Sequence, residues 1–113
     1  MPANCNMHGD IFGGWIMAEM DLAAAIAAGR YSSCRVVTVA VDKLVFKAPV
    51  KVGDTISCYT WVKEVGRTSM SIRVLVVCKD ITGKNVHEVT EGIYKMVAID
   101  EDGKPMLVDE KKN

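Results

Sequence analysis

Two carboxylates, Glu19 and Asp21, interrupt an otherwise apolar segment that runs from Trp15 to Ala28. An ionised carboxylate in an apolar setting is costly unless it is paired, protonated or used in chemistry. On a helix the two side chains would lie about 160° apart, with Asp21 among small residues and Glu19 on the bulky side, which we expect to face a sheet. Asp21 is therefore either a catalytic group or a structural carboxylate bonded across a subunit interface. For Glu19 we favour an ion pair at an interface or helix end.

A second group of candidates precedes the apolar segment. Asp10 can cap the start of a helix, and the amides of Gly13 and Gly14 at its N-terminus could polarise a carbonyl oxygen, as an oxyanion hole does. Asp10 and Asp21 are eleven positions apart, which is roughly 16 Å along a helix. They can serve one site only if they come from different subunits, which predicts an obligate dimer. His8 is a further acid–base candidate, although a loop histidine is more often simply solvated.

The elements that must position these groups follow from the periodicity of the sequence. The apolar segment is expected to form one buried helix that ends at Gly29, too short to cross a bilayer. Period-two runs rich in β-branched residues predict four strands. These are Arg35–Phe46, Thr55–Val65, Thr68–Lys79 and Val86–Ile99. We expect an α+β fold in which sequentially paired antiparallel strands form a long sheet curled around the helix.

Composition narrows the classes of function. The chain of 113 residues is expected to form a single domain, residues 1–113. Fourteen basic residues balance fourteen acidic ones, which gives no support for a nucleic-acid partner or an anionic membrane. The four cysteines are widely spaced without a CxxC pair and with few histidines nearby, which argues against a zinc site. No signal peptide is visible, so a cytoplasmic location is expected.

Three segments carry a resemblance to a known family: GDIFGGWIMAEMD (9–21), RVVTVAVD (35–42) with the following PVKVGD (49–54), and VGRTSMSI (65–72). Together they closely resemble acyl-CoA thioesterases of the YciA type, which have the hotdog fold. The resemblance implies a curved antiparallel sheet around a central helix, and subunits that dimerise by joining sheets edge to edge, commonly as trimers of dimers. It also implies hydrolysis of short- to medium-chain acyl-CoA to a free acid and CoA, without a metal or redox cofactor.

The resemblance also implies roles for individual residues. Asp21 is the catalytic carboxylate, acting as base or nucleophile, while Gly14 or Gly13 polarises the thioester carbonyl and Asp10 of a partner subunit orients water or substrate. The segment of Arg67, Thr68 and Ser69 is expected to lie beside CoA. There Arg67 could pair with phosphate, and the two hydroxyls could bond the pantetheine or the catalytic carboxylate. The alternative is that Thr68 and Ser69 only begin a strand.

The sequence departs from the family's pattern in two places, and two alternative functions remain. The family has a strand before the Met1-Pro2 pair, which is missing here, and often extends past the last strand. This edge of the sheet is therefore either supplied in another way, or the sequence is a fragment that lacks the first strand. A hotdog acyl-thioester dehydratase would need a catalytic histidine, for which His8 is the candidate, but a His-Phe-Pro segment is absent. A non-catalytic acyl-CoA-binding or regulatory module would keep the fold without needing Asp21.

Overall fold

The structure is a computed structural model that describes residues 13–108, and it contains one helix and four strands in that range. The elements are α1 Gly13–Ser32, β1 Arg35–Phe46, β2 Thr55–Val65, β3 Ser69–Lys79 and β4 Val86–Ile99. The predicted strands agree with the observed ones to within one residue, because alternating β-branched residues mark them clearly. No helix in residues 13–108 has the length and apolarity that crossing a membrane requires.

The end of α1 differs from the prediction. The helix continues past Gly29 and ends at Ser32, and Ser33 takes the left-handed conformation with a φ of 59°. The Ser33 amide donates a hydrogen bond to the Gly29 carbonyl at 2.7 Å. The Ser32 hydroxyl donates to the Ala28 carbonyl at 2.8 Å and accepts from the Cys34 amide at 3.1 Å. These bonds give hydrogen-bond partners to the carbonyls of Ala28 and Gly29 without a glycine at the C′ position. The prediction that the helix ends at Gly29 was wrong for this reason.

The four strands form one antiparallel sheet in the order β1-β4-β3-β2. The antiparallel prediction is confirmed, but the prediction of sequential pairing is wrong for β1, whose neighbour is β4. The segment 47–54 carries the chain from one edge of the sheet to the other instead of forming a hairpin. Because β3 and β4 hold most of the buried strand residues, they take the centre, and β1 and β2 become the edges.

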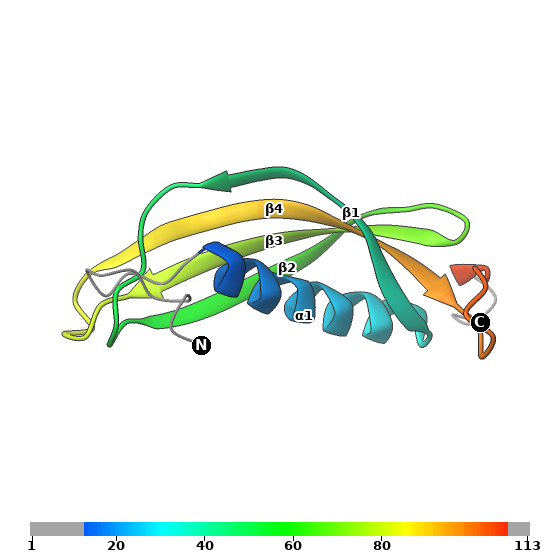
Figure 1. The fold of residues 1–113 in the computed structure, drawn as a ribbon, viewed down its shortest axis with the longest axis horizontal. Coiled ribbons are helices and arrows are strands. Elements are labelled where there is room, and N and C mark those ends of the chain that lie inside the picture. The colour runs from blue at the N-terminus through cyan, green and yellow to red at the C-terminus, as the bar shows by residue number, and fades with distance from the viewer. Residues whose placement is uncertain (1–12, 109–113) are drawn as a thin grey trace.

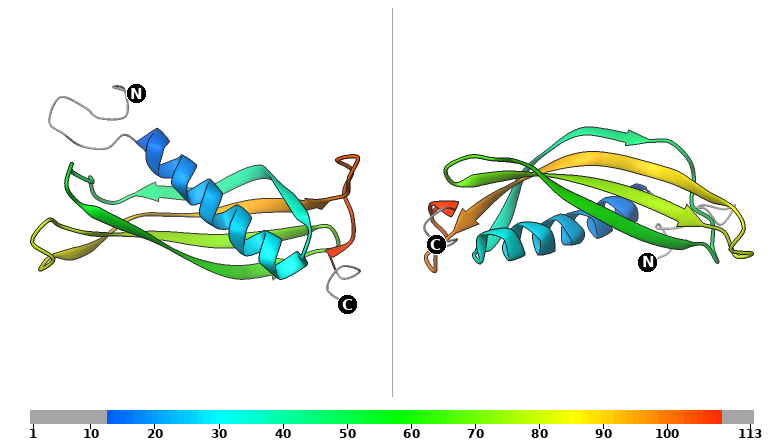
Figure 2. Two further views of the ribbon diagram at one scale, coloured as in Figure 1. Left: turned by 90° about the horizontal axis from the view of Figure 1, so that it is seen from below. Right: turned by 180° about the vertical axis from the view of Figure 1, so that it is seen from behind.

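Helix α1 lies across the concave face of this sheet, which curves around it (Figures 1 and 2). It packs through a sheet-facing stripe in which every fourth residue is buried. This stripe consists of Ile16, Met20, Ala24 and Ala28. Its partners in the core include Met70, Ile72, Val74 and Val76 of β3 and Tyr94, Met96 and Ala98 of β4. The predicted hotdog layout of a sheet wrapped around one central helix is thus present.

The helix is not buried on all sides, which corrects the expectation from its composition. An outer stripe on the opposite side is exposed and consists of Gly14, Ala18, Leu22, Ile26 and Arg30. Leu22 is 57% exposed and Ile26 is 47% exposed. The expectation that the bulky side faces the sheet was therefore wrong. Ile16 and Met20 fill the sheet-facing stripe in the first half of the helix, while Ala24 and Ala28 let the backbone approach the strands closely in the second half.

Strand β1 is irregular, and its irregularities bend it over the helix (Figure 1). Its register with β4 shifts between Thr38 and Ala40 and again between Asp42 and Val45. Lys43, within the second shift, has a φ of 52°. Bulges of this kind increase the local twist of a strand and redirect its side chains. The first shift follows directly after Thr38, whose side chain points toward α1.

Candidate active site

Asp21 faces the edge strand β1, where its carboxylate meets a hydroxyl group. Asp21 Oδ1 accepts a hydrogen bond from Thr38 Oγ1. The Thr38 oxygen also lies 3.2 Å from the sulfur of Met96, which is buried in the core. Asp21 is half-buried, so the carboxylate keeps access to solvent on one side. A carboxylate that is held by a neutral donor and stays partly exposed can act as a base or a nucleophile.

Tyr94 of β4 lies beneath the same part of the helix. Its side chain is buried, and its hydroxyl donates to the Met17 carbonyl at 3.0 Å. Burial raises the pKa of Tyr94 to about 12, and the negative charge of Asp21 and then Cys58 add to this effect. The phenol is therefore neutral at physiological pH, and it remains a hydrogen-bond donor to the helix backbone.

Glu19 lies on the other side of the helix from Asp21, as its angular separation predicts. Burial raises the pKa of the Cys58 thiol, and the charge of Glu19 raises it further, which places Glu19 toward β2. No ion pair joins Glu19 to another residue within 13–108. The predicted ion pair of Glu19 at a subunit interface stays a prediction.

The glycines at the start of α1 have different surroundings. A Cβ atom on Gly13 would lie 3.0 Å from the Phe46 ring. Within the described chain, the glycine therefore makes room for the side chain of Phe46. Gly14 is exposed, and a Cβ atom there would meet nothing within 4 Å. A cavity of about 320 Å³ opens beside this helix end. It is lined by Gly13, Ile16, Phe46, Lys47, Ala48, Pro49, Val50 and Val89. Asp10 and His8 lie outside the described residues, so their roles stay predictions.

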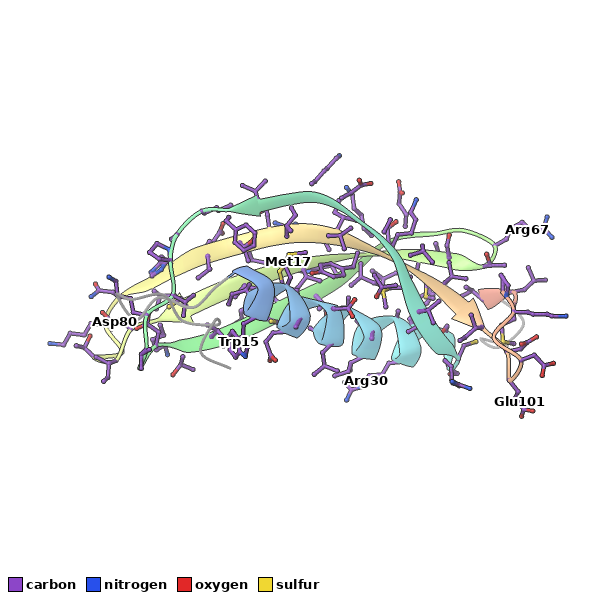
Figure 3. All side chains as sticks on the ribbon, in the orientation of Figure 1. Trp15, Met17, Arg30, Arg67, Asp80 and Glu101 are labelled. Carbon is purple, nitrogen blue, oxygen red and sulfur yellow. The ribbon has the colours of Figure 1, made fainter. Side chains whose placement is uncertain are left out.

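Arg67 and Thr68 lie in the turn between β2 and β3, and Ser69 is the first residue of β3. Figure 3 shows the Arg67 side chain pointing away from α1 at this end of the sheet. Ser69 lines a cavity of about 400 Å³ with Ser71 and Lys95. The intervening Met70 is buried in the core, so alternation places Ser69 on the convex face, opposite Asp21. Within one chain, the structure does not bring Ser69 to the carboxylate. The predicted contact of Arg67, Thr68 and Ser69 with CoA stays a prediction.

Thr38 is the site residue that sequence reasoning missed. It is a hydroxyl-bearing residue in the strand RVVTVAVD, at an alternating position shared with Val36, and it is seventeen positions from Asp21. A polar residue at an inward position of an apolar strand is a signal that something polar faces it. The missing information was which strand lies beside the helix. Among residues 13–108, no group of three or more histidine, cysteine, aspartate or glutamate side chains could hold a metal ion.

Comparison with known proteins identifies the family. The sequence profile of the Thioesterase superfamily matches residues 8–84. The acyl-CoA thioester hydrolase YciA of Escherichia coli K12 is 44% identical over 108 residues, covering 93% of this chain and 82% of that protein. The hexameric thioesterase y2039 from Yersinia pestis has a TM-score of 0.88 at 43% identity, over 95% of this chain and 87% of that one. Cj0915, a hexameric hotdog-fold thioesterase of Campylobacter jejuni, has a TM-score of 0.86 at 46% identity, over 99% and 87%. The chain therefore belongs to the thioesterase superfamily and has the hotdog fold.

Proposed function

We propose that this protein hydrolyses acyl-CoA thioesters to a free carboxylic acid and CoA, with Asp21 as the catalytic carboxylate. The proposal is supported by family membership and by close relatives named as acyl-CoA thioester hydrolases. The observation that carries it is the half-buried carboxylate of Asp21, held through one oxygen by the Thr38 hydroxyl. A thioesterase needs a group of this kind, because water must be activated or replaced as the nucleophile.

The chemistry follows from this arrangement. Because Thr38 donates to Oδ1, the carboxylate is oriented, and we assign the reaction to Oδ2. As a base, Asp21 takes a proton from water while the water oxygen attacks the thioester carbon. The carbon–sulfur bond then breaks and the CoA sulfur takes up the proton. As a nucleophile, Asp21 attacks the carbon itself, CoA leaves, and water hydrolyses the resulting anhydride. Label found in Asp21 after a single turnover in ¹⁸O-labelled water identifies the nucleophilic route with water attacking the Asp21 carboxyl carbon, because the base route never bonds the water oxygen to Asp21.

The remaining predicted residues complete the proposed site across two subunits. An amide at Gly13 or Gly14 polarises the thioester carbonyl, and Asp10 of a partner subunit orients water or substrate. Arg67, Thr68 and Ser69 contact CoA, and we propose that they do so in the site of another subunit, because Ser69 lies on the face opposite its own Asp21. This requires a homo-oligomer, and we propose a trimer of dimers because similar thioesterases are hexameric.

The dimer is proposed to form by edge-to-edge joining of sheets through β1. This strand is at one edge of the described sheet, and its Val37 and Val39 side chains are 42% and 55% exposed. Joining two such edges would pair the free backbone groups of the strand. Short- to medium-chain acyl groups are the proposed substrates, no metal or redox cofactor enters the mechanism, and the proposed location is the cytoplasm.

A thiol-release assay on a panel of acyl-CoAs of increasing chain length tests this function. We expect the wild-type protein to release CoA and Asp21→Asn to lose at least about 100-fold in kcat, the lower range for a general base. Glu19→Gln is the matched control, since it neutralises a carboxylate two positions away on another side of α1, and it should keep near wild-type activity. Binding of acyl-CoA without release by the wild type would instead indicate a non-catalytic acyl-CoA-binding module. Full activity of Asp21→Asn would refute the assignment of Asp21.

A further inference from the structure

Tyr94 makes a directed bond to the helix turn that carries Asp21. We propose that Tyr94 is a positioning residue for Asp21, holding this turn of α1 at a fixed place over β4. The inference rests on the proposed function of Asp21. Figure 3 shows Met17, the acceptor of the bond, on α1 close to the strands.

The bond has a specific relation to Asp21. The Tyr94 hydroxyl donates to the Met17 carbonyl at 3.0 Å, and the Tyr94 side chain is only 1% exposed. In an α-helix each carbonyl also accepts from the amide four residues later, which for Met17 is the amide of Asp21. The phenol and the Asp21 amide therefore converge on one oxygen. Any movement of this turn relative to the sheet would move the carboxylate.

The same strand also positions the other partner of Asp21. Met96 follows Tyr94 by two residues, so both side chains point to the helix side of β4. Met96 is the register partner of Thr38, and its sulfur lies 3.2 Å from the Thr38 oxygen. Strand β4 thus fixes the helix turn through Tyr94 and supports the Thr38 hydroxyl through Met96. The hydrogen bond between Thr38 and Asp21 depends on both contacts.

The hydrogen bond from Tyr94 to Met17 fixes the direction of the contact as well as its distance, which the surrounding apolar packing does not. Ile16 and Met20 of the sheet-facing stripe, which flank Met17 in the sequence, hold this turn through apolar contacts that are non-directional. A hydrogen bond fixes both distance and direction. Burial and the charge of Asp21 raise the pKa of Tyr94 to about 12, so the donor proton is retained throughout the pH range of an enzyme assay.

Tyr94→Phe tests the proposal, because it removes only the hydroxyl oxygen. We expect kcat to fall roughly three- to tenfold with KM unchanged, in line with the loss of one hydrogen bond that orients the reacting group. Tyr59→Phe is the matched control, since Tyr59 is 52% exposed and lies in edge strand β2. It should keep the wild-type kcat. Folded, oligomeric protein is isolated by gel filtration before assay, so that lost stability does not count as lost activity.

The double variant Asp21→Asn with Tyr94→Phe distinguishes the two proposals. If Tyr94 acts through Asp21, the double variant keeps the residual kcat of Asp21→Asn, whereas an independent effect would lower it further and overturn the inference. A wild-type kcat for Tyr94→Phe would also overturn it. Full activity of Asp21→Asn would instead refute the proposed function itself.

Should Tyr94→Phe not accumulate as folded protein, a fluorinated tyrosine at position 94 preserves the shape and lowers the phenol pKa. We then expect kcat to fall as pH rises through that lowered pKa, because a phenolate cannot donate to the Met17 carbonyl. The same pH profile as the wild-type protein would overturn the inference.

Discussion

Replacing Thr38 by valine removes the hydroxyl that holds the Asp21 carboxylate while keeping the shape of the side chain. A hydrogen bond to a charged group contributes roughly 1.5–3 kcal/mol. Thr38 is exposed and Asp21 is half-buried in the described chain, so water competes for the carboxylate and the lower value applies. If the bond orients Asp21 for reaction, about 1.5 kcal/mol lost from transition-state stabilisation corresponds to roughly a tenfold fall in kcat.

The assay is release of CoA at saturating acyl-CoA, with kcat and KM determined separately. Thr38→Ser is the matched control, because it keeps the hydroxyl donor and loses only a methyl group. We expect it to retain most of the activity lost in Thr38→Val. The folding stability of Thr38→Val should stay close to that of the wild type, since valine suits a strand. A kcat for Thr38→Val within twofold of the wild type would refute the reasoning that Thr38 orients Asp21.

Two further predictions concern stability. Met20 is fully buried in the sheet-facing stripe, so Met20→Ala should lower the free energy of unfolding by about 2–5 kcal/mol in denaturant titrations, whereas Ile81→Ala, at an 81% exposed turn position, should leave it nearly unchanged. Hydrogen bonds from Thr82 and then Asn85 lower the pKa of Asp80 to about 2, below its unfolded value of about 4. This stabilisation is complete above about pH 4 and is lost as pH falls toward 2, so the melting temperatures of the wild type and Asp80→Asn should converge over that interval.

The strands were predictable because the residues within each strand determine where it begins and ends. Alternation of β-branched residues sets where each strand begins and ends, and the four observed strands follow it. Their order in the sheet is not local information. Whether the segment 47–54 closes a hairpin or crosses to the far edge depends on which strands can be buried under the helix, a property of the whole core. The end of the helix depended on side-chain bonds of Ser32, which propensity alone does not reveal.

Of the residues at the candidate site, Asp21 could be predicted from the sequence, whereas Thr38 and Tyr94 could not. Asp21 stands out because a carboxylate in an apolar segment requires an explanation. Thr38 and Tyr94 do not stand out, since threonine and tyrosine are ordinary strand residues. They gain meaning only when β1 and β4 are both placed against α1, which requires the observed strand order. The hydrogen bonds of Thr38 and Tyr94 to α1 could therefore not be predicted before the strand order was known.

The apolar character of α1 on two opposite sides has a physical consequence for assembly. Its own sheet covers one stripe, yet Leu22 and Ile26 in the outer stripe remain exposed in the described chain. A surface helix of a monomer would carry polar residues there. The pattern fits a helix selected for two contacts, one within the chain and one in the proposed homo-oligomer. Asp21 lies between the two stripes, bonded to Thr38 and only half-buried. A carboxylate in that place is fixed by its own fold and remains accessible to groups from a partner subunit, as a site shared between subunits requires.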